Sequence, residues 1–353
     1  MFIRKRYSVI GMMKWTRWET LWFVFFSTVV TILYEIFGLT FLSFPWTPIA
    51  VVGTAVAFMI GFQNNAAYGR IWEARKIWGG IVNTSRTWGM KTKDMITNEH
   101  ATVKLTENEL YETRKTVVYR HIAWLTALRH AMRSARPWET FMEHRSNQEW
   151  SRKIYIPEKV STLEEDLKEY LTLEEQQYVL SKKNRPAALL YLQSKHLLAL
   201  KERGLVWEFS FLELENLLQE MFTLQGKSER IKNFPYPRQY ATLGSHFVWI
   251  FILLLPFGIV PEFGNIAEQL AESFPVISNY FIWLAIPFYV IISWVFHTME
   301  RVGRAGENPF EGTANDVPIS TISRGIEIDL RQLLDEDQEG IPKQFPEHLD
   351  VQM

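Results

Sequence analysis

The side chains that could carry covalent or metal chemistry are few in this chain of 353 residues. There is no cysteine, which excludes disulfide bonds, thiolate catalysis and cysteine-ligated metals. No two histidines have the helical spacing of a metal site together with a carboxylate partner, and no serine stands beside a recognisable base. The histidines are His100, His121, His130, His144, His196, His246, His297 and His348. We therefore expect no catalytic residue, no bound metal and no cofactor, and a membrane-anchored enzyme is the less favoured alternative.

A different chemistry is available between Phe44 and Trp78, where an uncharged segment continues in helical register into a charged one. Thr54, Phe58 and Phe62 follow one another at intervals of four, which stacks their side chains along one face of a helix. Such a face can pack against lipid or neighbouring helices, or it can line a pore. This segment alone leaves both interpretations open.

The distribution of charge indicates a membrane protein. The chain holds 38 lysines and arginines, yet none lies between Trp18 and Phe62 or between Ala241 and Glu300. Tryptophans stand at the ends of the apolar runs, as in the aromatic belts of membrane proteins. The predicted spans are residues 21–43, 48–70, 240–260 and 274–297, with an outer loop at 261–273. Because basic residues favour the cytoplasmic side, both termini and the middle of the chain are expected in the cytoplasm.

This pattern predicts an all-α, multi-pass protein of the cell membrane, with four transmembrane helices and a large cytosolic helical domain. The predicted segments are an interfacial segment (1–20), transmembrane helices 1 and 2 (21–70), the cytosolic domain (71–238), transmembrane helices 3 and 4 (239–300) and a cytosolic tail (301–353). Apolar periodicity predicts helices over 185–200, 205–225 and 321–334, and polar residues around Pro137 predict a loop over 134–157. The net charge of −1 gives no sign of nucleic-acid binding.

Three stretches stand in an order that one protein family shares. They are GFQNN (61–65) with EARKIWG (73–79), ERIKNFPYP (229–237) leading into LLPF (254–257), and ENPFEGTANDVP (307–318). Each stretch is a weak signal alone. Together, and with four spans, they make the chain similar to the bestrophin family in its bacterial form over residues 1–335.

The resemblance implies a homopentameric ion channel with one central pore in the lipid bilayer. The second span would line a narrow neck, with Thr54, Phe58 and Phe62 on the pore, so the resemblance favours the pore interpretation of this face. Bestrophins have three apolar residues there, and Thr54 departs from that pattern, which predicts a wetter uppermost ring. A second constriction at the cytosolic exit would fall on Phe209, with Leu212 one turn away as the alternative.

The sign of the permeating ion stays open. Bestrophins of animals pass chloride, whereas some bacterial relatives pass cations. Glu208, Glu213 and Glu215 lie beside the exit constriction, and they would concentrate cations if they faced the pore. Near the neck, the amides at 63–65 are uncharged and could serve either sign. A channel for small monovalent ions is therefore predicted, with anions as the family-typical choice and Na⁺ or K⁺ as the alternative.

Two further interpretations concern regulation and mechanism. Animal bestrophins bind calcium on an acidic run after Asn-Pro-Phe, but here only Glu311 and Asp316 are acidic, which is too few carboxylates for a good calcium site. We expect no calcium gating. A transporter would favour internal repeats, which the two pairs of spans do not show, and a scaffold without a pore would predict no conductance.

Overall fold

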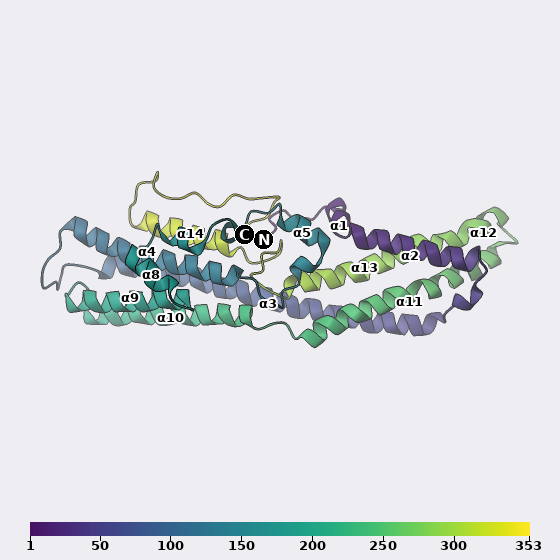
Figure 1. Ribbon diagram of the computed structural model, residues 1–353, viewed down its shortest axis with the longest axis horizontal. Coiled ribbons are helices and arrows are strands. Elements are labelled where there is room, and N and C mark those ends of the chain that lie inside the picture. Colours follow the sequence, from purple (N-terminus) through teal and green to yellow (C-terminus); the bar gives the residue numbers. More distant parts are fainter.

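A computed structural model describes all 353 residues as helices joined by short connections, with no β-strand. The molecule is elongated, and helix α3 (Trp46–Met95) runs along most of its length (Figure 1). At about 1.5 Å per residue, its 50 residues span roughly 75 Å. The helix is unbroken because its only proline, Pro48, lies in the first turn, where the backbone N–H needs no helical partner.

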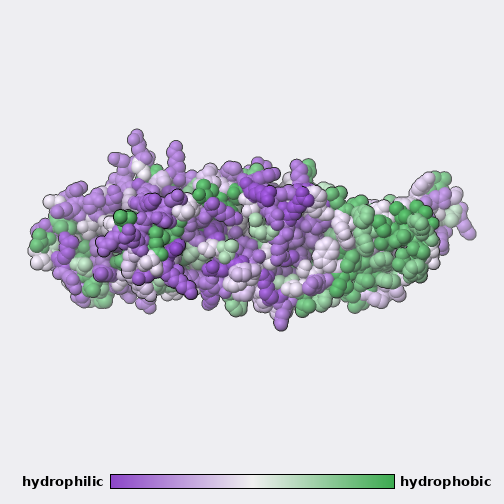
Figure 2. Space-filling view, viewed as in Figure 1, coloured by the Kyte–Doolittle hydropathy of each residue, from purple (hydrophilic) through white to green (hydrophobic).

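One end of the molecule is an apolar bundle (Figure 2). Here the first half of α3 packs against α11 (Arg238–Leu270) and α13 (Ala285–Gly306), and α2 (Arg17–Glu35) packs against α11 and α13, around a core of 14 buried residues. By length and composition, three helical segments are able to cross a membrane: α3, α11, and the run from α12 (Pro275–Phe281) through α13. The shorter α2 lies against them in the same bundle.

The other end is a more polar helical domain, predicted to be cytosolic, with a larger core of 37 buried residues. The second half of α3 packs there against α4 (Glu107–Arg133), α10 (Glu208–Asn233) and α14 (Ile319–Leu333), while α9 (Arg185–Glu202) packs against α4 and α10. The remaining elements are α1 (Val9–Trp15), α5 (Arg145–Ser151), α6 (Pro157–Val160), α7 (Leu163–Leu167), α8 (Leu173–Leu180), and the 3₁₀ turns Thr40–Leu42, Phe141–Glu143 and Ile282–Leu284.

Several predicted boundaries were wrong. The helix of the second predicted span continues into the charged segment, as its unbroken helical register predicts, and ends only at Met95, whereas the predicted outer loop at 261–273 is helical as far as Leu270. The predicted loop at 134–157 contains a 3₁₀ turn and α5. The helix predicted over 205–225 begins later and extends to Asn233. Where helical structure exceeds the prediction, a regular backbone continues through polar residues, because helical hydrogen bonds do not depend on the polarity of the side chains.

Two prolines inside α11 show how the apolar bundle compensates for missing backbone donors. Pro256 and Pro261 have no N–H, so the carbonyl groups four residues earlier, at Ile252 and Phe257, lose their helical partners. The hydroxyl of Tyr289 donates to the Ile252 oxygen at 3.2 Å, and the backbone N–H of Phe44 donates to the Phe257 oxygen at 2.9 Å. Both freed carbonyls are therefore satisfied by neighbouring segments, which an apolar environment requires.

Tyr289→Phe tests this compensation. We expect the variant to lose about 1–2 kcal/mol of stability, because the buried Ile252 carbonyl is left without a donor. The matched control is Tyr280→Phe, which removes a hydroxyl from a side chain that is exposed and makes no side-chain hydrogen bond. Thermal unfolding in detergent should show a lower midpoint for the first variant only, and equal midpoints would contradict the assignment.

Candidate ion pore

The three predicted neck residues lie on the face of α3 that points away from the bundle. Phe58 and Phe62 are 66% and 73% exposed in the single chain, and Thr54 is exposed as well. The opposite face, which includes Val56 and Ile60, is buried against the bundle. This half of α3 therefore has one face committed to its own chain and one face free for lipid, a pore or another copy.

A groove of about 850 Å³ runs along this free face. Thr54, Phe58 and Phe62 all line it, so the structure brings the predicted neck residues together on one wall. The Thr54 hydroxyl donates to the backbone carbonyl of Ala50 at 2.9 Å. Its only hydrogen is thus used inside the helix, and Thr54 offers the groove a methyl group and an acceptor. The expected wetter ring is therefore less polar than a free hydroxyl would make it.

A row of small residues lies beside the aromatic row. Ala57 and Gly61 are four residues apart, are exposed, and line the same groove as Phe58 and Phe62. Each small residue directly precedes an aromatic one, and consecutive positions on a helix are about 100° apart. The free face of α3 consequently has an aromatic side and a small side, which allows another helix to approach the small side closely.

The three amides below the neck do not share one role. Gln63 is buried, and its Nε2 donates to Oε1 of Glu307 at 2.7 Å. Asn64 is partly buried against α13, where a methyl group added to Gly303 would lie 2.3 Å from its Oδ1. Only Asn65 is exposed and lines the groove. The prediction that all three amides could serve the permeating ion is therefore wrong for Gln63, and Asn64 faces α13 rather than the groove.

Near Gln63, hydrogen bonds of Glu307 and Arg70 join α3 to the ends of α10 and α13. Burial raises the pKa of the Glu307 carboxyl, and the hydrogen bond from Gln63 opposes that rise. Arg70 of α3 donates to the carbonyl oxygen of Glu307 at 2.7 Å, and also to those of Ile231 and Phe234 at 3.2 and 2.8 Å. The guanidinium therefore ties the end of α10 and the end of α13 to the middle of α3.

The predicted exit residues lie at the far end of α3. A backbone bridge pairs Ile96, just after α3, with Val206, just before α10. Phe209 and Leu212 are on the first turns of α10, and they are 63% and 50% exposed. The ring of Phe209 packs against that of Trp207, with centroids 4.9 Å apart, and the position of Phe209 and Leu212 on the aperture of a pore stays a prediction.

The predicted vestibule carboxylates are not a free acidic face. Glu208 pairs with Lys201 at 2.9 Å, and Glu213 pairs with Lys91 of α3 at 2.5 Å. Glu215 is partly buried, and its Oε1 is enclosed without a hydrogen-bond donor. Two of the three carboxylates therefore have a lysine partner within the chain. Because both pairs are exposed to solvent, each lysine offsets the negative charge of its partner only in part.

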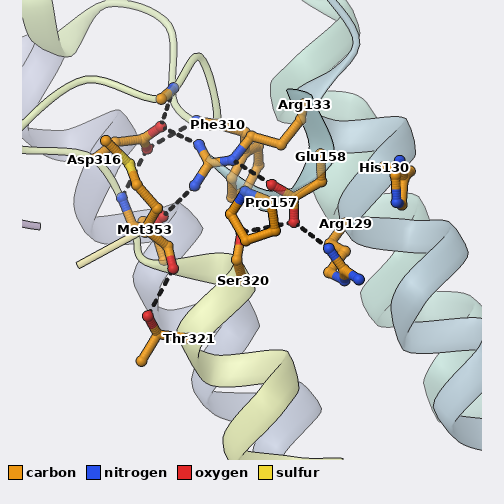
Figure 3. A network of polar contacts seen from close by, with 12 residues as sticks. Arg129, His130, Arg133, Pro157, Glu158, Phe310, Asp316, Ser320, Thr321 and Met353 are labelled. Atoms are coloured by element: carbon orange, nitrogen blue, oxygen red, sulfur yellow. Dashed lines mark hydrogen bonds and ion pairs between the residues drawn. The ribbon is translucent and has the colours of Figure 1, made fainter. Parts of the chain in front are cut away.

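The tail after α13 is fixed by a buried carboxylate (Figure 3). Asp316 accepts hydrogen bonds from the backbone N–H groups of Phe310, Gly312 and Val317 at 2.7–2.8 Å. It also accepts one from Nη1 of Arg133 on α4 at 2.8 Å, and both side chains are 2% exposed. The Asn-Pro-Phe segment is thereby closed into a compact turn and anchored to α4 of its own chain.

The two acids of this tail are occupied by protein donors. Glu311 accepts a hydrogen bond from the backbone N–H of Phe141 at 2.8 Å, and burial raises the pKa of its carboxyl to about 7. Asp316 is engaged as described above. A calcium ion would have to displace these donors, so the geometry supports the expectation of no calcium gating, which stays a prediction.

Comparison with known proteins decides the family. The family model described as bacterial/fungal bestrophin protein matches residues 9–332, which is nearly the whole chain. The chain belongs to the bestrophin family. The resemblance seen in the three sequence stretches is therefore confirmed, and the chain is an ion-channel-type membrane protein.

Relatives of this bestrophin carry the name voltage-dependent anion channel-forming protein. The protein YneE of Salmonella typhi is 26% identical over 310 residues, covering 88% of this chain and 84% of the relative. The protein RSc3414 of Ralstonia nicotianae is 26% identical over 295 residues, covering 83% and 79%. YneE of Escherichia coli K12 is 25% identical over 295 residues, covering 84% and 79%.

Solved structures support the fold of this bestrophin. A bacterial bestrophin homologue from Klebsiella pneumoniae superimposes with a TM-score of 0.68 at 22% identity, covering 91% of this chain and 99% of that one. A point variant of the Klebsiella homologue gives 0.67 at 22% identity, covering 90% and 99%. At this level of identity the likeness establishes the all-helical bestrophin fold.

Sequence reasoning missed the polar junctions of this bestrophin. Arg70 and Arg133 were not singled out, although each is a basic residue whose hydrogen bonds fix the position of α3 or of the tail. One signal was present: Arg129 and Arg133 are four apart on a long predicted helix, so they share a face that must meet acidic residues if it is buried.

Asp316→Ala tests the anchoring of the tail. The change leaves Arg133 buried with a weaker partner and removes an acceptor from three backbone N–H groups, so we expect a loss of about 3 kcal/mol or more. Asp329→Ala is the control, because Asp329 pairs with Arg86 on the surface and should cost less than about 0.5 kcal/mol. Similar midpoints of unfolding for both variants would exclude the anchoring role.

Proposed function

We propose that this bestrophin forms a homopentameric channel in the cell membrane and conducts small monovalent ions through a central pore lined by α3. The observation that carries the proposal is the free face of α3, where Thr54, Phe58 and Phe62 stand on one wall of an open groove while the opposite face is buried. In a single chain this face is exposed, whereas in a ring of chains it would line a central pore.

The two rows on the free face support assembly into a closed ring. The aromatic side of one α3 can meet the small side of the next, formed by Ala57 and Gly61, in a contact between two different surfaces. Contacts of this head-to-tail kind generate a closed ring when the rotation between copies closes. The pentamer itself comes from the family resemblance, and it accounts for both the exposed aromatic rings and the small residues beside them.

In such a pore, Phe58 and Phe62 would form two successive apolar rings. An ion entering them loses hydration and receives no polar replacement, so the neck closes by expelling water and opens when it widens. Phe209, with Leu212 beside it, would form the second constriction at the cytosolic end of the same path. The ion would then pass Asn65 between the two, where the amide can meet either sign of charge.

We propose anions as the principal permeating ions. The neck contains no charge, the relatives carry the name anion channel-forming, and Glu208 and Glu213 are paired with lysines. A cation channel of the same fold is the second candidate. Its support is the stretch from Leu205 to Gly226, which begins α10 and holds no basic residue, so unpaired carboxylates there would attract cations.

The proposed topology has four spans and both termini in the cytoplasm. Three helical segments are long and apolar enough to cross a bilayer, and α2 would be the fourth. Its 19 residues correspond to roughly 28 Å of helix, close to the thickness of the hydrocarbon core. The segments predicted for the membrane, 21–70 and 239–300, would then alternate with the cytosolic segments 71–238 and 301–353, with 1–20 at the interface.

Phe58→Ala and Phe62→Ala test the neck. Each removes one apolar ring, and we expect a conductance several-fold higher or a more frequently open channel in planar bilayers, because the widened neck holds water. Phe25→Ala is the control, since Phe25 is equally exposed but lies on α2. Unchanged currents in both neck variants, or the same change in the control, would remove Phe58 and Phe62 from the pore.

The reversal potential under a KCl gradient tests the sign of selectivity. Purified protein in a planar bilayer should reverse near the chloride equilibrium potential if anions permeate. A reversal near the potassium equilibrium potential would overturn the anion proposal in favour of the cation candidate. Intact pentamers without any current would contradict the channel proposal and leave a scaffold or a transporter.

A further inference from the structure

A cleft of about 730 Å³ opens in the cytosolic domain, away from the candidate pore. It lies between the end of α4, the short helices α6 and α7, and the start of α9, and none of its lining residues belongs to α2, α3, α11 or α13. Its size falls in the range of small-molecule sites in proteins, about 300–1,000 Å³. The charge of its walls indicates which molecules it suits.

Five basic side chains line this cleft without an acidic partner. They are Arg136, Lys159, Lys182, Lys183 and Arg185, and no carboxylate oxygen lies within 4.0 Å of their charged nitrogens. Their side-chain contacts are with neutral groups, such as the amide oxygen of Asn233 for Arg136 and the ring of Tyr178 for Lys182. No ion pair within the protein therefore neutralises these five side chains.

The one carboxylate in the lining faces inward. The side chain of Glu158 is 1% exposed, and its Oε1 accepts from Nη1 of Arg129 at 2.6 Å and from the hydroxyl of Ser320 at 2.7 Å (Figure 3). The Glu158 carboxylate is therefore already bonded to Arg129 and Ser320. Glu158 therefore does not neutralise the bases at the rim.

Arg133 adds a buried hydrogen-bond donor to the cleft. It lines the cleft, its side chain is 2% exposed, and its Nε–H has no hydrogen-bond acceptor. Oε2 of Glu158 lies 3.9 Å from that nitrogen, beyond hydrogen-bond distance. In addition, the 18-residue helix α9 begins at Arg185, so the positive end of its dipole borders the cleft. An unpartnered buried donor and a helix N-terminus both favour an anion.

We propose that this cleft binds a small soluble molecule carrying two or more phosphate groups. Basic side chains contributed by three separate segments can hold several negative charges at once, which a single monovalent ion does not require. The inference concerns a site distinct from the pore, and it does not depend on the sign of the conducted ion. Since Arg133 also anchors Asp316, an occupied cleft would sit next to the contact that holds the tail.

The test is binding of sodium tripolyphosphate to the full-length protein in detergent, measured by isothermal titration calorimetry at physiological salt. We expect saturable binding that weakens about tenfold or more in Lys182→Gln/Lys183→Gln, because two cations are lost from the cleft. The control is Lys195→Gln/Lys227→Gln, which removes the same charge from two exposed lysines without ion pairs elsewhere on the cytosolic domain. The control should bind as the unmodified protein does.

A second arm distinguishes two sources of phosphate groups. Dioctanoyl phosphatidylinositol bisphosphate, a soluble form of a membrane lipid, is titrated against the same proteins. Tighter binding of tripolyphosphate supports a free polyphosphate, as we propose. If the lipid binds more tightly and the cleft variant loses that binding, the ligand is a lipid headgroup and not a free polyphosphate. No saturable binding of either probe, or equal loss in the cleft and control variants, overturns the proposal.

Discussion

The single long helix α3 is the constraint on which the rest of the structure depends. Its first half lies in an apolar bundle and its second half in a polar domain, yet no break separates them. One face must therefore be covered by α11 and α13 at one end and by α10 and α14 at the other. Any change in the tilt or position of α3 would move the free face that carries Phe58 and Phe62 together with the polar helical domain.

The junctions that hold α3 in place are polar and buried. Arg70 reaches the carbonyl groups that end α10 and α13, and Gln63 bonds the carboxyl of Glu307. Further along, Phe310 packs beside Trp78 with ring centroids 6.3 Å apart, while Asp316 binds Arg133. Because a buried polar group is costly when it loses its partner, these contacts admit few alternative arrangements of the tail.

The apolar end follows a different rule, which concerns the backbone. Pro256 and Pro261 remove two donors from α11, and a hydroxyl and a backbone N–H from elsewhere supply them. The hydroxyl of Thr54 is likewise satisfied within the protein, because it donates to a carbonyl group of its own helix. The surface that α3 leaves free is consequently more apolar than its composition suggests, which suits a neck that closes by expelling water.

Much of this organisation was predictable from the sequence. The absence of basic residues between 18 and 62 and between 241 and 300 marked the apolar segments, and the spacing of Thr54, Phe58 and Phe62 placed them on one face. The all-α fold and the bestrophin family followed from periodicity and from motif order. These features depend on local spacing or on composition, so they can be predicted without knowledge of the tertiary contacts.

Only the tertiary structure decided which polar groups are free. By sequence, Gln63, Asn64 and Asn65 are equivalent amides, but only Asn65 reaches the groove, because helical rotation turns Gln63 toward Glu307. By sequence, Glu208 and Glu213 have no evident partner, but in the structure they form exposed ion pairs with Lys201 and Lys91. Hydrophobic periodicity determines which face of a helix is buried, whereas the partner of each charge depends on distances between segments far apart in the sequence, which no local pattern contains.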